Sequence, residues 1–203
     1  MLDRIGGAHC AAQASRFPRL SRAALRPPLK RAIDIAGAAA LLLSLAPVFV
    51  LVSLLLRADS GPAFVARRRV GRGGREFGHL AFRAPEEAGG ERLTRLGRLL
   101  RRPALDELPR LLNVLRGDMS LVGPRPVARG ELDRRYALFG GAAAYLSVRP
   151  GLVNPCQVYG RGALGARERV ALDTAYAQRP SLRADLAILA RTVGIVPRRP
   201  ASH

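Results

Sequence analysis

The chain has no tryptophan, two cysteines and three histidines, and aromatic residues make up only 5% of it. Cys10 and Cys156 lie far apart, with no second cysteine or histidine near either of them at metal-ligand spacing. This scarcity argues against a disulfide framework and against a zinc site. The histidines, His9, His79 and His203, are equally scattered, and we expect each of them to be a surface or packing residue.

Acidic residues are also scarce, with 15 aspartates and glutamates against 34 lysines and arginines and a formal charge of +19. The expected partners are therefore anionic: a phospholipid surface, nucleotide phosphates or nucleic acid. Nucleic acid fits poorly, because few aromatic side chains are present for base stacking and because a long apolar run is hard to place in a soluble binding domain. Lys30 is the only lysine, and we attribute part of the preference for arginine to codon bias.

The long apolar run extends from Ile33 to Leu56 and is interrupted only by Asp34 and two serines. As a straight helix its 24 residues would extend roughly 36 Å, which exceeds the hydrocarbon core of a bilayer, about 30 Å thick. Pro47 lies near the middle, where it removes a backbone hydrogen bond and predicts a bend or break. Basic residues flank both ends, which favours a re-entrant hairpin with both ends cytoplasmic over a straight anchor with a tolerated kink.

The remaining sequence predicts a small mixed domain, so the fold class is α+β and predominantly helical. Glycines and prolines between residues 59 and 83 separate short extended pieces, which predicts a pair of strands. Leucines at helical spacing over residues 91–100, with arginines between them, predict an amphipathic helix suited to an anionic membrane surface or to ordinary packing. Further helical regions are expected at residues 105–117, at residues 127–139 and on both sides of Pro180.

Two neighbouring acids, Asp106 and Glu107, fall in the first turn of the helix expected over residues 105–117. Such acids commonly do no more than cap free N–H groups and complement the helix dipole. Here arginines lie close in sequence, among them Arg101 and Arg125, and a helix N-terminus is itself a phosphate site. A carboxylate among arginines stays ionised and can attack phosphorus, while its neighbour could hold a divalent cation that bridges phosphate oxygens.

A long segment, LDELPRLLNVLRGDMSLVGPRP, carries these acids and is highly specific. It occurs in order with KRAIDI, the apolar stretch with its central proline, DSGPAFVARRRVGRGGREF, FR, VRPG, QVYGR and LD. In this order of motifs, which covers residues 30–196, the chain resembles the bacterial sugar transferase family. The members of this family are monotopic polyprenyl-phosphate phosphoglycosyl transferases, which start the assembly of exopolysaccharide, capsule, O-antigen or glycoprotein glycans.

The resemblance implies a chemistry and a set of site residues. Asp106 would be the nucleophile that takes the phosphosugar from a UDP-sugar and releases UMP, and undecaprenyl phosphate would then attack the intermediate. Glu107 would be its partner, with Mg²⁺ held by the two carboxylates. The residues expected to bind substrate or phosphate are Arg83, Arg101, Arg125, Arg149 and Asp173. Of these, Arg149 is a weaker candidate, and so is Arg161 outside this set. Both would make structural or nucleotide contacts.

The resemblance also implies an organisation. Residues 1–29 would form a basic mobile tail, residues 30–57 the re-entrant membrane hairpin, and residues 198–203 a second tail. Residues 58–197 would form the catalytic phosphoglycosyl transferase domain, with amphipathic interfacial helices and a few short strands. The chain would lie on the cytoplasmic face of the bacterial inner membrane, in contact with its lipids. The sugar, the glycan pathway and the oligomeric state, a homodimer included, are left open.

The chain departs from the family pattern at several positions. Ala81 stands where the family often has a basic residue, Ala46 precedes Pro47 where a serine is common, and the segment after Gly151 has no tryptophan. These departures leave one alternative, a catalytically weakened scaffold of a glycan assembly complex. A membrane-anchored enzyme of another phosphoryl-transfer type is a second alternative.

Overall fold

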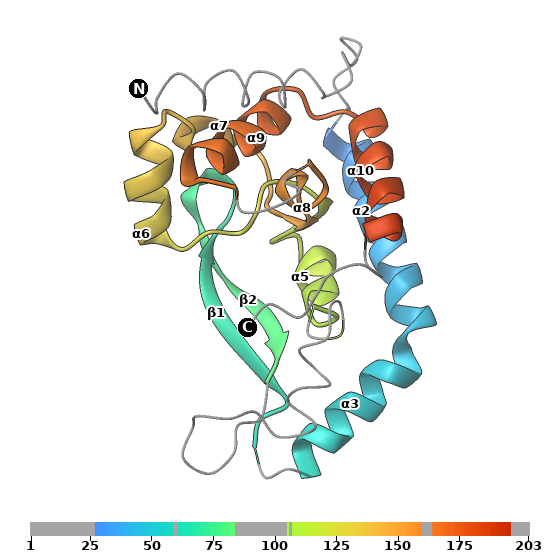
Figure 1. The fold of residues 1–203 in the computed structure, drawn as a ribbon. Helices are drawn as coiled ribbons and strands as arrows, with labels where there is room; N and C mark the ends of the chain where they lie inside the picture. Colours follow the sequence, from blue (N-terminus) through green and yellow to red (C-terminus); the bar gives the residue numbers. More distant parts are fainter. Residues whose placement is uncertain (1–26, 59–60, 84–104, 106, 160–163, 196–203) are drawn as a thin grey trace.

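The computed structural model describes residues 27–58, 61–83, 105, 107–159 and 164–195. Helices and strands are both present, so the predicted mixed α+β class is confirmed for this part of the chain (Figure 1). The amphipathic helix expected over residues 91–100 and the C-terminal tail fall outside the described residues. The same holds for the N-terminal tail as far as residue 26, and the first described helix begins at Pro27.

Two consecutive helices, α2 (Pro27–Ser44) and α3 (Ala46–Ala58), form the apolar run and meet at a bend of 65°. Pro47 lies in the first turn of α3, where its missing N–H interrupts the hydrogen bonds that would join the two helices into one. The hydroxyl of Ser44 donates to the carbonyl of Ala40 at 2.8 Å, a bond that also favours bending. The break predicted near Pro47 is therefore confirmed.

Within the described part of the chain, no helix is long and apolar enough on its own to cross a membrane. Residues 28–44 and 46–58 pass the same test of length and apolarity only when they are taken together across the bend. Many leucine and valine side chains on these two helices are exposed, and Leu43 is exposed by 79%. The relation of this bent pair to a bilayer stays a prediction.

An antiparallel hairpin of β1 (Phe64–Val70) and β2 (Glu76–Phe82) follows the bent pair in the sequence. At the open end of the hairpin Phe64 pairs with Phe82. Both rings contact Phe49 of α3, and the three ring centroids lie 5.3 to 5.7 Å apart. The predicted pair of strands is confirmed, and this aromatic cluster joins it to α3, which lies beside the lower part of the hairpin in Figure 1.

Helix α5 (Arg110–Arg116) follows the two neighbouring acids in the sequence. It ends at Gly117, whose φ of 95° stops the helix where the sequence predicted. Its start differs from the prediction, because the chain before it forms tight turns in which the N–H of Arg110 donates to the carbonyl of Glu107 at 2.9 Å. Pro109 has no N–H with which to make the α-helical bond to the carbonyl of Leu105. Glu107 therefore precedes the helix instead of lying in its first turn.

Asn113 of α5 is fully buried and joins this helix to the hairpin. Its side-chain amide donates to the carbonyl of Gly78 at 2.8 Å, and its Oδ1 accepts from the N–H of Leu80 at 3.0 Å. Both partners lie on β2, so one side chain satisfies a donor and an acceptor of the strand. These bonds fix α5, and with it the chain that carries Glu107, against the hairpin.

Two strands of three residues each, β3 (Ser120–Val122) and β4 (Gly151–Val153), form a parallel pair that the sequence did not predict. Their close approach requires glycine at two positions. A Cβ added to Gly151 would collide with the backbone nitrogen of Gly123, and one added to Gly123 would collide with the carbonyl oxygen of Arg149. Strands this short carry no alternating pattern that sequence reading could detect.

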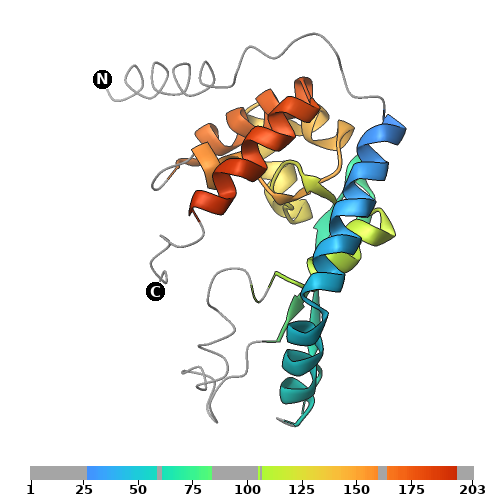
Figure 2. The same ribbon diagram turned by 90° about the vertical axis from the view of Figure 1, so that its right-hand side faces the viewer.

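The C-terminal half is a cluster of short helices, the last of which packs against these two strands (Figure 1). In chain order they are α6 (Arg129–Glu131), the π-helical turn η2 (Leu132–Tyr136), α7 (Ala142–Ser147), α8 (Pro155–Tyr159), α9 (Ala166–Gln178) and α10 (Leu182–Ile195). The predicted break at Pro180 separates α9 from α10. Figure 2 shows this cluster at one end of the molecule, while α3 and the open end of the hairpin extend towards the other.

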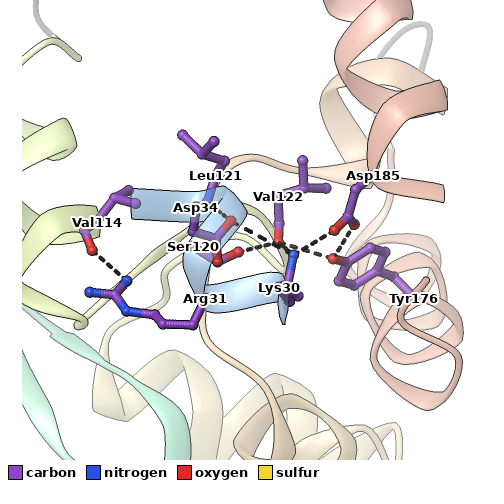
Figure 3. A network of polar contacts seen from close by, with 9 residues as sticks. All are labelled: Lys30, Arg31, Asp34, Val114, Ser120, Leu121, Val122, Tyr176 and Asp185. Carbon is purple, nitrogen blue, oxygen red and sulfur yellow. Dashed lines mark hydrogen bonds and ion pairs between the residues drawn. The ribbon is translucent and has the colours of Figure 1, made fainter. Parts of the chain in front are cut away.

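A buried polar network holds the start of α2 against β3 and the C-terminal helices (Figure 3). The ammonium of Lys30 lies 2.6 Å from Oδ2 of Asp185 and 3.9 Å from Oδ1 of Asp34. Asp185 also accepts from the hydroxyl of Tyr176 at 2.6 Å, and Asp34 accepts from the N–H of Leu121 at 3.1 Å. One ammonium therefore serves two buried carboxylates that come from α2 and α10.

The neighbouring Arg31 connects the same turn of α2 to α5. Its guanidinium donates to the carbonyls of Val114 and Leu115 at 2.6 and 2.9 Å. These carbonyls belong to the last turn of α5, where the helix leaves acceptors without an intrahelical partner and where positive charge is favourable. Because α5 ends beside the start of α2, it begins nearer to the bend between α2 and α3.

We expect Lys30→Met to lower the free energy of unfolding by roughly 3 kcal/mol, because it leaves two buried carboxylates without a cation. Chemical denaturation of the purified protein measures this loss. The control is Arg68→Met, which breaks an exposed ion pair with Glu76 at 3.8 Å and should cost less than about 1 kcal/mol. Equal losses in the two variants would contradict a special role for the network.

We expect Gly151→Ala to lower the melting temperature by roughly 10 °C, because its methyl group meets backbone atoms of Gly123 that no side-chain rotation can move. Gly78→Ala is the matched control, since its added Cβ would lie 3.4 Å from the Cβ of Ala66, an ordinary contact. Thermal unfolding followed by circular dichroism compares the two. A Gly151→Ala variant that melts together with the control would show that the β3 and β4 backbones can separate without loss.

Candidate active site

The acidic pair predicted as the reacting centre lies directly before α5, and the structure describes one of its two members. Glu107 forms an ion pair with Arg110 in which Oε1 lies 2.7 Å from Nη1. Both side chains are partly exposed, so this carboxylate can be reached from solvent. Asp106 and Arg101 lie outside the described residues. The described part of the predicted centre is therefore one carboxylate held by one guanidinium.

His79 of β2 lies close to this ion pair but adds no charge to it. Burial, and then the positive charges of Arg110, Arg69 and Arg67, lower the pKa of His79 to about 3. The imidazole is therefore neutral at physiological pH. The prediction that this histidine is a packing residue is confirmed by its burial.

The segment GPRP forms a loop that leaves β3 and exposes the side chain of Arg125. The N–H of Gly123 donates to the carbonyl of Val153 at 3.1 Å, and the carbonyl of Pro124 accepts from the N–H of Gly151 at 2.9 Å. The base of the loop is thus bonded to β4. A guanidinium that projects from a fixed loop can bind two phosphate oxygens at once. The structure therefore agrees with a phosphate-binding role for Arg125, which stays a prediction.

Asp173 of α9 is almost completely buried, with 1% of its surface exposed. Its Oδ2 accepts from the hydroxyl of Tyr136 at 2.6 Å, and its Oδ1 lies 3.7 Å from Sγ of Cys156. Burial raises the pKa of Asp173 to about 6, although these hydrogen bonds favour the ionised form. The structure therefore buries this predicted site residue, and its carboxylate faces protein groups.

Cys156 of α8 completes the surroundings of Asp173. Burial, followed by the nearby carboxylate, raises the pKa of its thiol far above the ordinary value. The side chain is therefore a neutral thiol and not a nucleophile at physiological pH.

Arg83 lies at the open end of the hairpin, against the last turn of α3. Its Nη2 donates to the carbonyl of Leu56 at 3.4 Å. Its guanidinium packs on Gly61, where an added Cβ would lie 2.6 Å from Cζ. A cation at the C-terminal carbonyls of a helix is favourable. The structure therefore gives Arg83 a contact that joins the hairpin to α3, and the phosphate contact predicted for it stays a prediction.

Arg149 lies beside the C-terminal end of α5, whereas Glu107 precedes the N-terminal end. Its Nε donates to the carbonyl of Gly117 at 2.8 Å. Burial, and then the positive charges of Arg31 and Arg72, lower its pKa. Together with Arg72, Arg75 and Asp118 it lines a hollow of about 380 Å³. The structure therefore does not bring this predicted phosphate ligand together with Glu107.

Mg²⁺ was predicted between the two acids, and this prediction can be compared with the donor groups that precede α5. The described residues include no group of three or more histidine, cysteine, aspartate or glutamate side chains that could hold a metal ion. Mg²⁺ requires less, because it commonly binds one or two carboxylates and completes its shell with water and substrate phosphates. Glu107, partly exposed and adjacent in sequence to Asp106, fits that mode of binding.

Two tyrosines near Arg125 were not predicted as site residues. Tyr136 donates to Asp173, which lies 37 residues further along the chain. Tyr145 donates to the carbonyl of Val70 at 2.7 Å and accepts from the N–H of Val127 at 3.2 Å. Neither tyrosine belongs to a motif or to a periodic pattern in the sequence. No signal in a single sequence would have found them, because their partners come from distant elements.

Residues 25–199 match the family model described as bacterial sugar transferase. The chain is 39% identical over 195 residues to the exopolysaccharide production protein ExoY of Rhizobium meliloti, with 82% of this chain and 84% of that protein covered. It is 43% identical over 181 residues to the UDP-glucose:undecaprenyl-phosphate glucose-1-phosphate transferase of Caulobacter vibrioides, with 81% and 68% covered.

Other relatives are longer than this chain. The undecaprenyl-phosphate galactose phosphotransferase of Salmonella typhimurium is 34% identical over 201 residues, which cover 86% of this chain and 42% of that protein. The chain thus spans most of the length of some relatives and less than half the length of others. The family match covers most of the chain and includes the acidic pair, the GPRP loop and Asp173. The chain therefore belongs to the bacterial sugar transferase family and is an enzyme of the phosphoglycosyl transferase type.

Proposed function

We propose that this chain transfers a sugar 1-phosphate from a UDP-sugar to undecaprenyl phosphate, releases UMP and so starts the synthesis of a glycan. The observation that carries the proposal is the similarity, over about four fifths of the chain, to transferases named for UDP-glucose, galactose and undecaprenyl phosphate. One similar protein is named for exopolysaccharide production, which favours exopolysaccharide as the product. The similar proteins differ in their sugar, so the sugar remains to be measured.

The proposed reaction consists of two displacements at the same phosphorus atom. A carboxylate oxygen of Asp106 bonds to the β-phosphorus of the UDP-sugar, and the bond from that phosphorus to the bridging oxygen breaks. UMP leaves with the electron pair of the broken bond. An oxygen of undecaprenyl phosphate then bonds to the same phosphorus and displaces the Asp106 carboxylate. The product is a lipid diphosphate sugar, and the carboxylate returns to its starting state.

The remaining side chains would act by charge and position. Arg125 on its loop and Arg101 before the acidic pair would bind phosphate oxygens of the nucleotide. Arg110 holds the carboxylate of Glu107 through the ion pair at 2.7 Å, which restricts the directions in which that carboxylate can point. Glu107 would hold Mg²⁺ with Asp106, and the cation supplies charge neutralisation at the phosphate oxygens when it is bound.

The proposed location is the cytoplasmic face of the inner membrane, with α2 and α3 as a re-entrant hairpin. The support for it is the 65° bend together with the apolar side chains exposed on both sides of the bend. Four of them are exposed by 54% to 79%: Leu43, Val50, Leu51 and Leu54. Acyl chains would remove this surface from water at a gain of about 25 cal/mol per Å². The lipid phosphate would then meet the acidic pair at the level of the headgroups.

We expect Asp106→Asn to lower UMP release by roughly three orders of magnitude, because the amide cannot attack phosphorus. The assay contains UDP-glucose or UDP-galactose, undecaprenyl phosphate and Mg²⁺. A second measurement omits the lipid: the unsubstituted enzyme should then release no more than one equivalent of UMP, and the variant none. The control is Asp133→Asn, which removes an exposed acid on η2 and should leave both measurements unchanged.

Each outcome decides a different part of the proposal. An unchanged rate in Asp106→Asn would remove Asp106 as the nucleophile. Full turnover with lipid but no UMP release without it would replace the covalent intermediate by direct transfer. No turnover by the unsubstituted chain with any UDP-sugar of a broad panel would favour the scaffold alternative.

We expect both ends of the chain to be shielded from a membrane-impermeant thiol reagent in intact cells, because a re-entrant hairpin returns the chain to the cytoplasm. Cys10 reports the N-terminal end in a Cys156→Ser background, and Ser202→Cys reports the C-terminal end when Cys10 is also replaced. Labelling after membrane permeabilisation is the control for reactivity. A C-terminal cysteine that reacts in intact cells would show that the bent pair spans the membrane.

A further inference from the structure

We propose that the hollow between the turn of the hairpin and the C-terminal end of α5 is a second phosphate site, whose ligand is a soluble phosphate monoester such as a sugar phosphate. The hollow lies at the opposite end of α5 from Glu107, and a helix of seven residues is about 10 Å long. The proposal goes beyond the proposed function and does not rest on it, because it follows from the shape and the charges of the hollow.

Three parts of the chain form the hollow, which has a volume of about 380 Å³. The 3₁₀ turn η1 (Arg72–Gly74) between β1 and β2 forms one wall, Gly117 and Asp118 after α5 form the second, and Arg149 before β4 forms the third. Phe77 of β2 adds an apolar surface. Small-molecule sites commonly measure about 300 to 1,000 Å³, and a bare phosphate would fill only part of this one. We therefore infer a ligand in which the phosphate is attached to a larger body.

The charges around the hollow are mostly positive. Arg72, Arg75 and Arg149 border it, against the single acid Asp118. Within the described part of the chain, none of these three guanidiniums forms an ion pair. The carboxylate of Asp118 accepts instead from the side-chain amide of Asn113 at 3.3 Å. Positive charges gathered around a concave surface repel one another and attract an anion.

Glu76, the acid next to Arg75 in the sequence, pairs outside the hollow. Its carboxylate lies 3.8 Å from Nη1 of Arg68 and 3.5 Å from Nε of Arg129. Successive side chains of a strand point to opposite faces, and both Arg75 and Phe77 line the hollow. The acid of β2 therefore neutralises arginines on the other face of the strand.

Arg149 is the arginine of the hollow whose direction is fixed. Its Nε donates to the carbonyl of Gly117 at 2.8 Å, which leaves its two terminal amino groups to bind two oxygens of one phosphate. The same glycine lies against a fourth guanidinium, because a Cβ added to Gly117 would lie 3.4 Å from Nη2 of Arg31. A side chain at this position, where φ is 95°, would therefore crowd Arg31.

The place of the hollow in the fold favours a soluble ligand over a lipid headgroup. The hairpin turn lies at the opposite end of the strands from Phe64 and Phe82, whose rings pack on α3. Figure 1 shows the turn beside the helical cluster and the open end of the hairpin beside α3. A strand of seven residues is roughly 20 Å long. If α3 contacts acyl chains as proposed, the hollow opens on the water side.

The first test measures the binding of ribose 5-phosphate to the full chain in detergent by calorimetry, without Mg²⁺ or UDP-sugar. An Arg125→Gln background weakens the phosphate site proposed on the GPRP loop. We expect the double variant Arg72→Gln and Arg75→Gln to raise Kd at least roughly tenfold, because two guanidiniums of the hollow are lost. The matched double variant, Arg68→Gln and Arg134→Gln, removes two exposed guanidiniums elsewhere and should change Kd less than about twofold.

The second test locates the ligand. Phenylglyoxal modifies accessible guanidiniums, and mass spectrometry of peptides gives the rate at each arginine. Ribose 5-phosphate at roughly ten times its Kd should slow the modification of Arg72 and Arg75 roughly tenfold and leave that of Arg68 unchanged. Ribose without the phosphate should protect none of them. Bilayers that contain phosphatidic acid present the same phosphate monoester on a lipid and test the other source.

The outcomes decide between a site and a general attraction of anions. Equal increases of Kd in the two double variants, or no increase in either, would show that the hollow is not the site and would overturn the proposal. Protection of Arg72 and Arg75 by phosphatidic acid bilayers but not by ribose 5-phosphate would assign the hollow to a headgroup and overturn the soluble ligand. Neither test requires turnover, so a chain that turns over no UDP-sugar would refute the proposed function and leave this site to be decided by binding.

Discussion

The ion pair between Lys30 and Asp185, 2.6 Å long, is the contact on which the arrangement of this enzyme depends. It joins the start of α2 to α10 across 155 residues of sequence. In the same turn of α2, Arg31 holds the end of α5 and Asp34 holds the middle of β3. One helical turn therefore positions three elements that come from distant parts of the chain. Each leads towards the candidate site, because α5 follows the acidic pair, β3 continues into the GPRP loop, and α10 packs behind β3.

The chemistry of this contact explains why a chain rich in arginine has lysine here. Lys30 is the only lysine among 34 basic residues. Its ammonium lies 2.6 Å from Asp185, 3.9 Å from Asp34 and 3.4 Å from the carbonyl of Val122. These acceptors belong to α10, α2 and β3, and an ammonium is a compact charge whose three donors can point to separate elements. A guanidinium directs its donors within one plane, as Arg31 does towards adjacent carbonyls of α5. We attribute part of the surplus of arginine to codon bias, whereas the separate positions of these acceptors favour a lysine at residue 30.

The features that could be predicted from the sequence are those that one residue or one short segment determines. Pro47 predicts the bend and Gly117 the end of α5. The residues proposed for the site come, by resemblance, mostly from the LDELP and GPRP segments, and their roles stay predictions. The parallel pair of β3 and β4 could not be predicted, because its closeness depends on Gly123 and Gly151, which meet only after folding. The burial of Asp173 could not be predicted for the same reason. Its position in the LD motif indicates importance, but its role depends on which side chains two other elements, η2 and α8, bring to it.

Two groups of contacts position the two halves of the candidate site. The chain with the acidic pair follows α5, which Asn113 bonds to the hairpin, and the hairpin packs through its aromatic cluster on α3. A displacement of α3 would therefore act on the hairpin and through it on α5. The loop that carries Arg125 is held instead by β4 and by Tyr145 of α7, a helix of the cluster at the other end of the molecule (Figure 2). The position of Glu107 relative to Arg125 then depends on the place where the two groups of contacts meet, at β3 and the first turn of α2.

A polar network that is buried and paired resists displacement better than an apolar contact that can slide, because each group that moves loses a specific partner. For this reason the ion pair of Lys30 holds together the elements that lead to the candidate site.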